Sequence, residues 1–148
     1  WSLIRKTQSP AELKTFVENI TDVVISYIES VQKQKAANII TQVKALVEKN
    51  YARDASLETV ASQVFISPCY LSVIFKKETN ITFKNYLIQT RIENAKELLE
   101  KTDLKIYDIA EKVGYNNTRY FSELFQRICG KTPSQYRASH NPSMPQDI

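Results

Sequence analysis

The chain has 148 residues, of which 43% are hydrophobic and 24% are charged, and its formal net charge at pH 7 is +4. This length allows one domain, or one domain with an appendage. Only 2 glycines and 5 prolines interrupt the sequence, which favours helices over a turn-rich β architecture. One histidine and two distant cysteines provide no set of metal ligands and no catalytic triad, so we expect no enzyme and no cofactor.

The composition also bears on the setting of the protein. No apolar run approaches the ~20 residues that a membrane span needs, so we expect no membrane segment. The two cysteines have no metal-like spacing and are expected to be reduced thiols in a cytoplasmic protein. We expect no small-molecule ligand in this sequence. Because it begins at Trp1, we expect it to be a piece of a longer protein.

An N-terminal helical connector is expected over residues 1–36. Ser9, Pro10 and Glu12 form the pattern of a capping box. A helical stripe of apolar residues follows, namely Leu13, Phe16, Ile20, Val24, Tyr27 and Val31. Both a dimer seam and packing within the chain are compatible with this stripe. A second stripe begins at Ile39, and the intervening sequence leaves open whether one helix or two cover this region.

Further start signals divide the rest of the chain into short helices. Expected N-caps are Ser56, Ser67 before Pro68, Thr82, Asn116 or Asn117, and Thr132 before Pro133. They predict helices ending near Val64, Thr79, Glu100 and, after a start at Ile106, Val113. Asn80 and Gly114 suit left-handed or turn positions. The last ten residues, 139–148, are expected to be a disordered tail.

Residues 57–87 and 106–137 form an internal repeat within a predicted domain over residues 37–138. Val60, Ala61 and Val64 align with Ile109, Ala110 and Val113, and Leu71 and Phe75 align with Phe121 and Phe125. A helix with a small residue, a short turn and a second helix is the pattern of a helix-turn-helix unit. The fold class is therefore predicted to be all-α, with two helix-turn-helix subdomains joined by a long linker helix.

Positive charge follows the repeat. Residues 63–92 carry four basic residues and one acidic residue, as do residues 115–138, whereas residues 93–111 carry six acidic residues and three lysines. In a helix-turn-helix unit the second helix enters the major groove of DNA. The linker helix of about 19 residues would be ~28 Å long, near the ~34 Å between successive major grooves. Sequence-specific binding of double-stranded DNA in successive major grooves is therefore the predicted function.

From Ile39 to Ala138 the sequence resembles the AraC/XylS-type transcription regulators. The resemblance rests on "SPCYLSVIFKKE", "YLIQTRIENAKELLEKTDLKIYDIAEKVGY" and "YFSELFQRICGKTPSQYR". It implies the output domain of a bacterial transcription regulator, an activator that binds promoter DNA and contacts RNA polymerase. The preceding "QSPAELKTFVENI" is similar to the connector of AraC-type response regulators of two-component systems.

The resemblance also implies which residues meet DNA. The two recognition helices are expected at 68–79 and 117–129. Groove-facing residues are expected to be Cys69, Ser72 and Val73 in the first, and Thr118, Arg119, Ser122 and Glu123 in the second. Arg119 suits a guanine, and Glu123 suits a cytosine amino group or a pair with Arg119 or Arg127. Phosphate contacts are expected from Ser67, Lys76, Lys77, Asn117, Arg127, Lys131, Thr132 and Arg137.

A second function stays open on the sequence alone. Residues 1–50 could be the working surface of a helical protein-interaction or dimerisation module, with a homodimer formed through the N-terminal helix. This reading is compatible with DNA binding by the rest of the chain.

Overall fold

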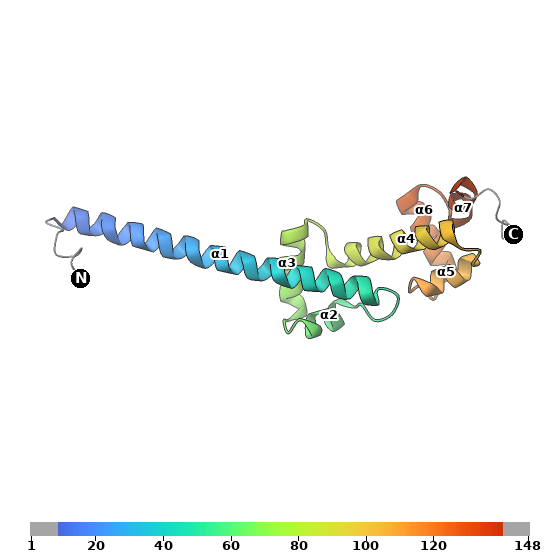
Figure 1. Cartoon of the computed structure of the whole chain (residues 1–148), viewed down its shortest axis with the longest axis horizontal. Coiled ribbons are helices and arrows are strands. Elements are labelled where there is room, and N and C mark those ends of the chain that lie inside the picture. Colours follow the sequence, from blue (N-terminus) through green and yellow to red (C-terminus); the bar gives the residue numbers. More distant parts are fainter. Residues whose placement is uncertain (1–8, 141–148) are drawn as a thin grey trace. The chain divides into compact units, whose positions relative to one another are not determined.

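The computed structural model describes residues 9–140. Its helices are α1 (Pro10–Asn50), α2 (Leu57–Gln63), α3 (Pro68–Thr79), α4 (Phe83–Lys101), α5 (Ile106–Lys112), α6 (Thr118–Cys129) and α7 (Pro133–His140), and the described residues contain no strand (Figure 1). The predicted all-α class is confirmed. Ser139 and His140 were expected in a disordered tail, but they form the end of α7 because Thr132 and Pro133 start a helix that continues to His140; residues 141–148 lie outside the described part.

The chain divides into two units, residues 1–39 and 40–148. The capping box at the start of α1 forms as predicted: the backbone N–H of Glu12 donates to Ser9 Oγ, and the N–H of Ser9 donates to Glu12 Oε2, each at 3.2 Å. The question of one helix or two is settled in favour of one, since α1 continues unbroken to Asn50. Residues 11–50 contain neither glycine nor proline, so nothing breaks the helix.

Short polar side chains cap α2, α3, α4 and α6, whereas α5 has no side-chain cap. The Ser56, Ser67 and Thr82 hydroxyls accept backbone N–H bonds of 3.1–3.2 Å three residues downstream. Asn117, rather than Asn116, caps α6, with its Oδ1 accepting from the N–H of Tyr120 at 2.9 Å. Asn80 adopts the left-handed conformation after α3, with φ of 61°. These local signals explain why the predicted helix boundaries agree with the structure to within one or two residues.

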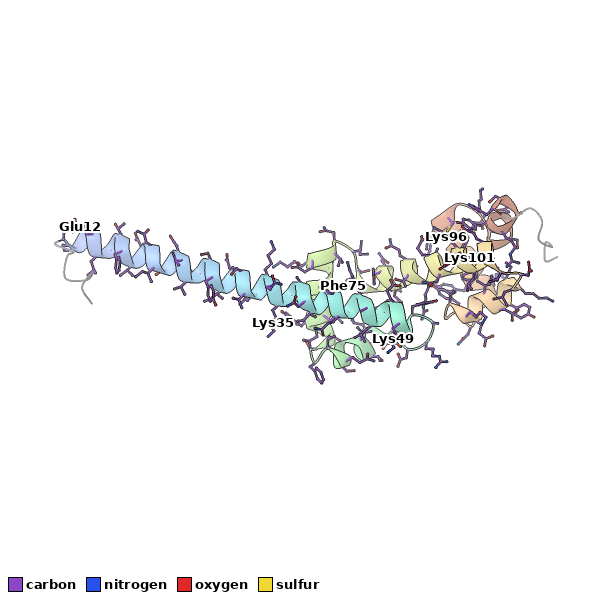
Figure 2. All side chains as sticks on the ribbon, viewed as in Figure 1. Glu12, Lys35, Lys49, Phe75, Lys96 and Lys101 are labelled. Carbon is purple, nitrogen blue, oxygen red and sulfur yellow. The ribbon has the colours of Figure 1, made fainter. Side chains whose placement is uncertain are left out.

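The sequence repeat is also a structural repeat. Ala61 and Ala110 are fully buried where α2 packs against α3 and where α5 packs against α6. Phe75, labelled in Figure 2, is in edge contact with Phe83, with ring centroids 5.6 Å apart. Phe125 contacts Tyr136 in the same manner at 5.5 Å. Each helix-turn-helix unit therefore packs against the helix that follows it, which is α4 for the first and α7 for the second.

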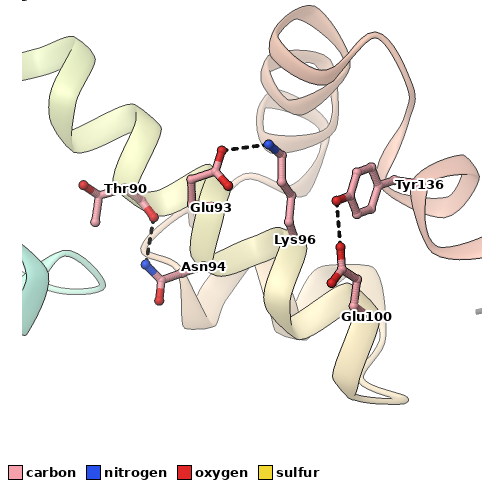
Figure 3. Close-up of polar contacts among 6 residues, drawn as sticks. All are labelled: Thr90, Glu93, Asn94, Lys96, Glu100 and Tyr136. Carbon is pink, nitrogen blue, oxygen red and sulfur yellow. Dashed lines mark hydrogen bonds and ion pairs between the residues drawn. The ribbon is translucent and has the colours of Figure 1, made fainter. Parts of the chain in front are cut away.

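The linker helix α4 makes several polar contacts on the side of the second helix-turn-helix unit. Tyr136 Oη donates to Glu100 Oε1 at 2.8 Å, which ties α7 to α4 (Figure 3). Lys96 pairs with Glu93 at 2.7 Å, and the Asn94 amide donates to the Thr90 carbonyl at 2.8 Å (Figure 3). Of these three contacts, only the bond between Tyr136 and Glu100 joins two helices; the other two lie within α4.

Within residues 9–140, no single helix is both long and apolar enough to cross a membrane; α2 and α3 meet the length and composition criteria only as a pair, and they are bent by 93°.

Replacing the glycine between α5 and α6 is expected to destabilise the fold. Gly114 has φ of +91°, and a Cβ there would lie 2.9 Å from the Arg91 guanidinium and 3.0 Å from the Ala52 carbonyl oxygen. Gly114→Ala should therefore lower the free energy of unfolding by about 2 kcal/mol, which combines left-handed strain with crowding. Gly130→Ala is the matched control: φ is +75°, with open space around the new Cβ, so a loss of about 1 kcal/mol is expected. Urea unfolding measures both; equal losses would contradict the crowding.

Candidate nucleic-acid interface

The first candidate recognition helix, α3, has one buried and one exposed side. Its buried residues are Leu71, Ile74 and Phe75. The opposite side is exposed and holds every predicted contact of this helix, namely Cys69, Ser72, Val73, Lys76 and Lys77. Val73 is 60% exposed, so its methyl groups are open to contact. Their contacts with bases and phosphates remain predictions, but all five are sterically available.

The second candidate recognition helix, α6, repeats this division. Phe121, Leu124 and Phe125 are buried. Arg119, Glu123 and Arg127 are exposed, whereas Thr118 and Ser122 are half-buried. The helix is more sharply divided between apolar and charged faces than α3, and it offers longer polar side chains for hydrogen bonding to base edges.

Arg119 and Glu123 form an ion pair along the exposed side of α6. Arg119 Nε donates to Glu123 Oε1 at 3.0 Å, and both side chains are largely exposed. Of the two partners that the sequence left open for Glu123, the structure shows Arg119. Such an exposed pair contributes little to stability. It does orient the guanidinium, because Nε is occupied while both Nη groups can bond elsewhere.

The predicted phosphate contacts around the helix starts are mostly accessible. Ser67, Asn117 and Lys131 are exposed and Thr132 is half-buried. The side-chain oxygens of Ser67, Asn117 and Thr132 accept capping bonds. Their hydroxyl hydrogens or amide groups, and free N–H groups of the first helical turn, remain as donors for phosphate oxygens.

Arg137 does not fit the expected phosphate contact. Its residue is 5% exposed, and its Nη2 donates to the carbonyl oxygen of Leu104. A guanidinium buried in this way cannot reach a phosphate on the surface. Arg137 instead fixes α7 to the segment between α4 and α5, and we remove it from the candidate interface.

Two tyrosines of the candidate helices were not identified as contacts from the sequence. Tyr70 and Tyr120 occupy equivalent positions of the repeat and are 47% and 49% exposed. A phenolic hydroxyl beside a DNA-reading helix is a suitable phosphate donor. The signal was present in the alignment, where both tyrosines directly precede the matching core residues Leu71 and Phe121.

Other tyrosines serve the interior. Burial, together with the hydrogen bond to Glu100, raises the pKa of Tyr136 to about 12. Burial also raises the pKa of Tyr115, and the nearby Arg91 cation opposes that rise. Within the described part of the chain, no three His, Cys, Asp or Glu side chains gather into a possible metal site.

Comparison with known proteins identifies proteins that share this sequence and fold. Residues 60–139 match the family model described as a helix-turn-helix domain. An uncharacterized HTH-type transcriptional regulator of Escherichia coli K12, YijO, is 32% identical over 130 residues, covering 88% of this chain. The chain spans only 45% of the length of that relative.

Two solved structures share the fold. The C-terminal domain of AraT, a response regulator from Geobacillus stearothermophilus, is 38% identical with a TM-score of 0.67, covering 74% of this chain and 89% of that one. The DNA-binding domain of the global transcriptional factor AdpA, solved in complex with a target DNA, is 25% identical with a TM-score of 0.66, covering 73% and 97%.

Proposed function

This chain belongs to the AraC/XylS-type helix-turn-helix family, and we propose that it is the DNA-binding output domain of a bacterial transcription regulator of the response-regulator type. The observation that carries the proposal is the division of α3 and α6: each buries its aromatic and aliphatic side and exposes the side predicted to face DNA. The AdpA domain, solved with its target DNA, has the same fold.

The proposed mechanism assigns separate tasks to the two helices. α3 presents Cys69, Ser72 and Val73, which are short or apolar and suit thymine methyl groups or shape readout. α6 presents Arg119 and Glu123, which suit hydrogen bonds to a G·C pair. Most base discrimination should therefore reside in α6. The domain acts by binding DNA in the cytoplasm. It activates transcription through contact with RNA polymerase.

Selection from a random pool of duplex DNA tests the proposal. The chain should enrich sequences with two short preferred blocks, separated as two successive major grooves require. Fluorescence anisotropy with the selected duplex and with an unrelated duplex then measures the preference. Equal affinity for both duplexes at every salt concentration, or no binding, would reject sequence-specific recognition.

The exposed face of α1 favours a second, compatible role, dimerisation. Nine large hydrophobic side chains between Leu13 and Val31 are 45–69% exposed, and Figure 2 shows side chains projecting around this part of the helix between Glu12 and Lys35. Six of them alternate at spacings of four and three residues, namely Leu13, Val17, Ile20, Val24, Tyr27 and Val31. This is the spacing of a coiled-coil seam, with valine at each a position (Val17, Val24 and Val31); a β-branched residue at a is typical of two-stranded parallel coiled coils in which leucine occupies d, as Leu13 does here. We therefore propose a homodimer through this helix.

A charge placed in the seam is expected to abolish that dimer. Val24→Asp would bury a carboxylate between two helices, whereas Ser26→Asp places the same charge on the opposite side of α1. Sedimentation of the chain at micromolar concentration should give a dimer for the wild type and for Ser26→Asp, and a monomer for Val24→Asp. A wild-type monomer, or a dimer that survives Val24→Asp, would exclude the seam.

A further inference from the structure

One arginine of the linker helix joins three segments that are distant in sequence. Arg91 Nε donates to the carbonyl oxygen of Tyr51 at 2.8 Å, and its Nη1 donates to the carbonyl oxygen of Gly114 at 3.1 Å. Its Cζ also lies 5.1 Å from the centre of the Tyr115 ring. The side chain is therefore engaged on two edges and one face. Arg91 is one of the four basic residues counted in 63–92, but its guanidinium bonds to backbone carbonyl groups inside the domain.

The joined segments belong to both helix-turn-helix units. Tyr51 directly follows α1 and begins the connection into α2, while its side chain packs on the core of the second unit. Gly114 lies in the turn between α5 and α6, three residues before the Asn117 cap of α6. Arg91 thus connects the entrance of the first unit to the turn that aims the second recognition helix.

The chemistry of the guanidinium suits this task. Its planar fork donates to two carbonyl oxygens in different directions, which a lysine ammonium on a flexible stem does less well. The Tyr51 carbonyl lies just beyond the C-terminus of α1, where carbonyl groups lack helical donors and favour a cation. Gly114 leaves the space that Arg91 fills, because a Cβ at Gly114 would lie 2.9 Å from the guanidinium.

We propose that Arg91 is a positioning residue that fixes the second helix-turn-helix unit relative to the first and thereby sets the spacing of the two DNA half-sites that the chain accepts. This inference rests on the proposed DNA binding. Without the link, α4 would still connect the two units, but the turn before α6 would lose its tie to the entrance of the first unit.

Half-site spacing is the readout that a merely stabilising residue would not move. One added base pair shifts a half-site by about 3.4 Å and rotates it by about 35°. We expect wild-type affinity to fall about tenfold or more when the preferred spacing changes by one base pair. Arg91→Met, which keeps the length of the stem, should reduce that penalty to threefold or less while weakening binding at the preferred spacing. Arg53→Met, an exposed arginine close to Tyr51, should leave the profile unchanged.

A measurement on the free protein separates this inference from the proposed function. Spin labels on Cys69 of α3 and on Gln126→Cys of α6, with Cys129→Ser, report the distance between the two helices by pulsed electron resonance. The distribution should be narrow in the wild type and in Arg53→Met, and broad in Arg91→Met. If Arg91→Met does not fold, Arg91→Lys should fold and give an intermediate width.

Two results would overturn the role of Arg91. One is a distance distribution in the Arg91 variant as narrow as that of the wild type. The other is a spacing profile that is lowered by the same factor at every spacing. Failure of all variants and the wild type to bind DNA would instead reject the proposed function, while the distance distributions would still decide whether Arg91 holds the units together.

Discussion

Raising the salt concentration from 50 to 200 mM is expected to weaken DNA binding by this chain about a hundredfold. Four predicted phosphate contacts are exposed cations, namely Lys76 and Lys77 on α3, Arg127 on α6, and Lys131 before α7. Each phosphate neutralised on duplex DNA releases counterions and contributes about −0.9 to the slope of log K against log salt, so four predict a slope of about −4. Anisotropy titrations at four or five salt concentrations measure it.

The double variant Lys76→Ala/Lys131→Ala tests whether these cations are the source of the slope. The slope should fall to about −2, and the affinity loss over the same salt range to about tenfold, on preferred and unrelated duplexes alike. Lys33→Ala removes an exposed charge from α1, so it should keep the wild-type slope. A double variant with the wild-type slope, or with an altered base preference, would contradict the phosphate assignment.

The parts of the fold that the sequence predicts are those decided by neighbours in the chain. Two helix starts are defined by capping hydrogen bonds between residues three positions apart. One is at Ser67 and Pro68, and the other is at Thr132, Pro133 and Gln135. The buried sides of α3 and α6 follow from helical spacing. The internal repeat supports each buried position, because the aligned residue of the other helix is also apolar. The exposed faces are what remains. Every predicted contact except Arg137 is exposed or half-buried in the structure, and the contacts of these residues with DNA stay a prediction.

The misplaced residue shows the limit of that reasoning. From the sequence, Arg137 is predicted to be a surface charge, because the carbonyl group that it bonds, in Leu104, is 33 residues away. The same holds for Arg91, whose carbonyl partners are 40 and 23 residues away. A carbonyl left without a helical donor at a helix end or turn is satisfied by whichever donor the fold brings to it. Sequence spacing carries no record of that pairing, so a basic patch counted from sequence overstates the charge available to DNA.

Removing the Arg119 side chain is expected to produce the largest loss of sequence preference. With Nε held by Glu123, the edge formed by the two Nη groups is left to bond guanine O6 and N7 together. Arg119→Ala should therefore weaken binding to the selected duplex by about 1–3 kcal/mol, and relax the preference at one base pair. Affinities for duplexes substituted at every position of the site measure both effects. Arg127→Ala, on the same helix, should weaken all duplexes equally.

Glu123→Ala decides between two ways in which the pair could act. If Glu123 only orients Arg119, its removal should relax the same base pair as Arg119→Ala, and the double variant should add nothing further, because the two residues then act as one unit. If Glu123 itself accepts from a cytosine amino group, a second position should relax and the two losses should add. Thermal stability should change little in either case, since the ion pair is exposed. If Arg119→Ala and Glu123→Ala each lowered affinity equally on every duplex, both roles would be rejected, and Arg119 would have to be assigned to phosphate rather than to a base.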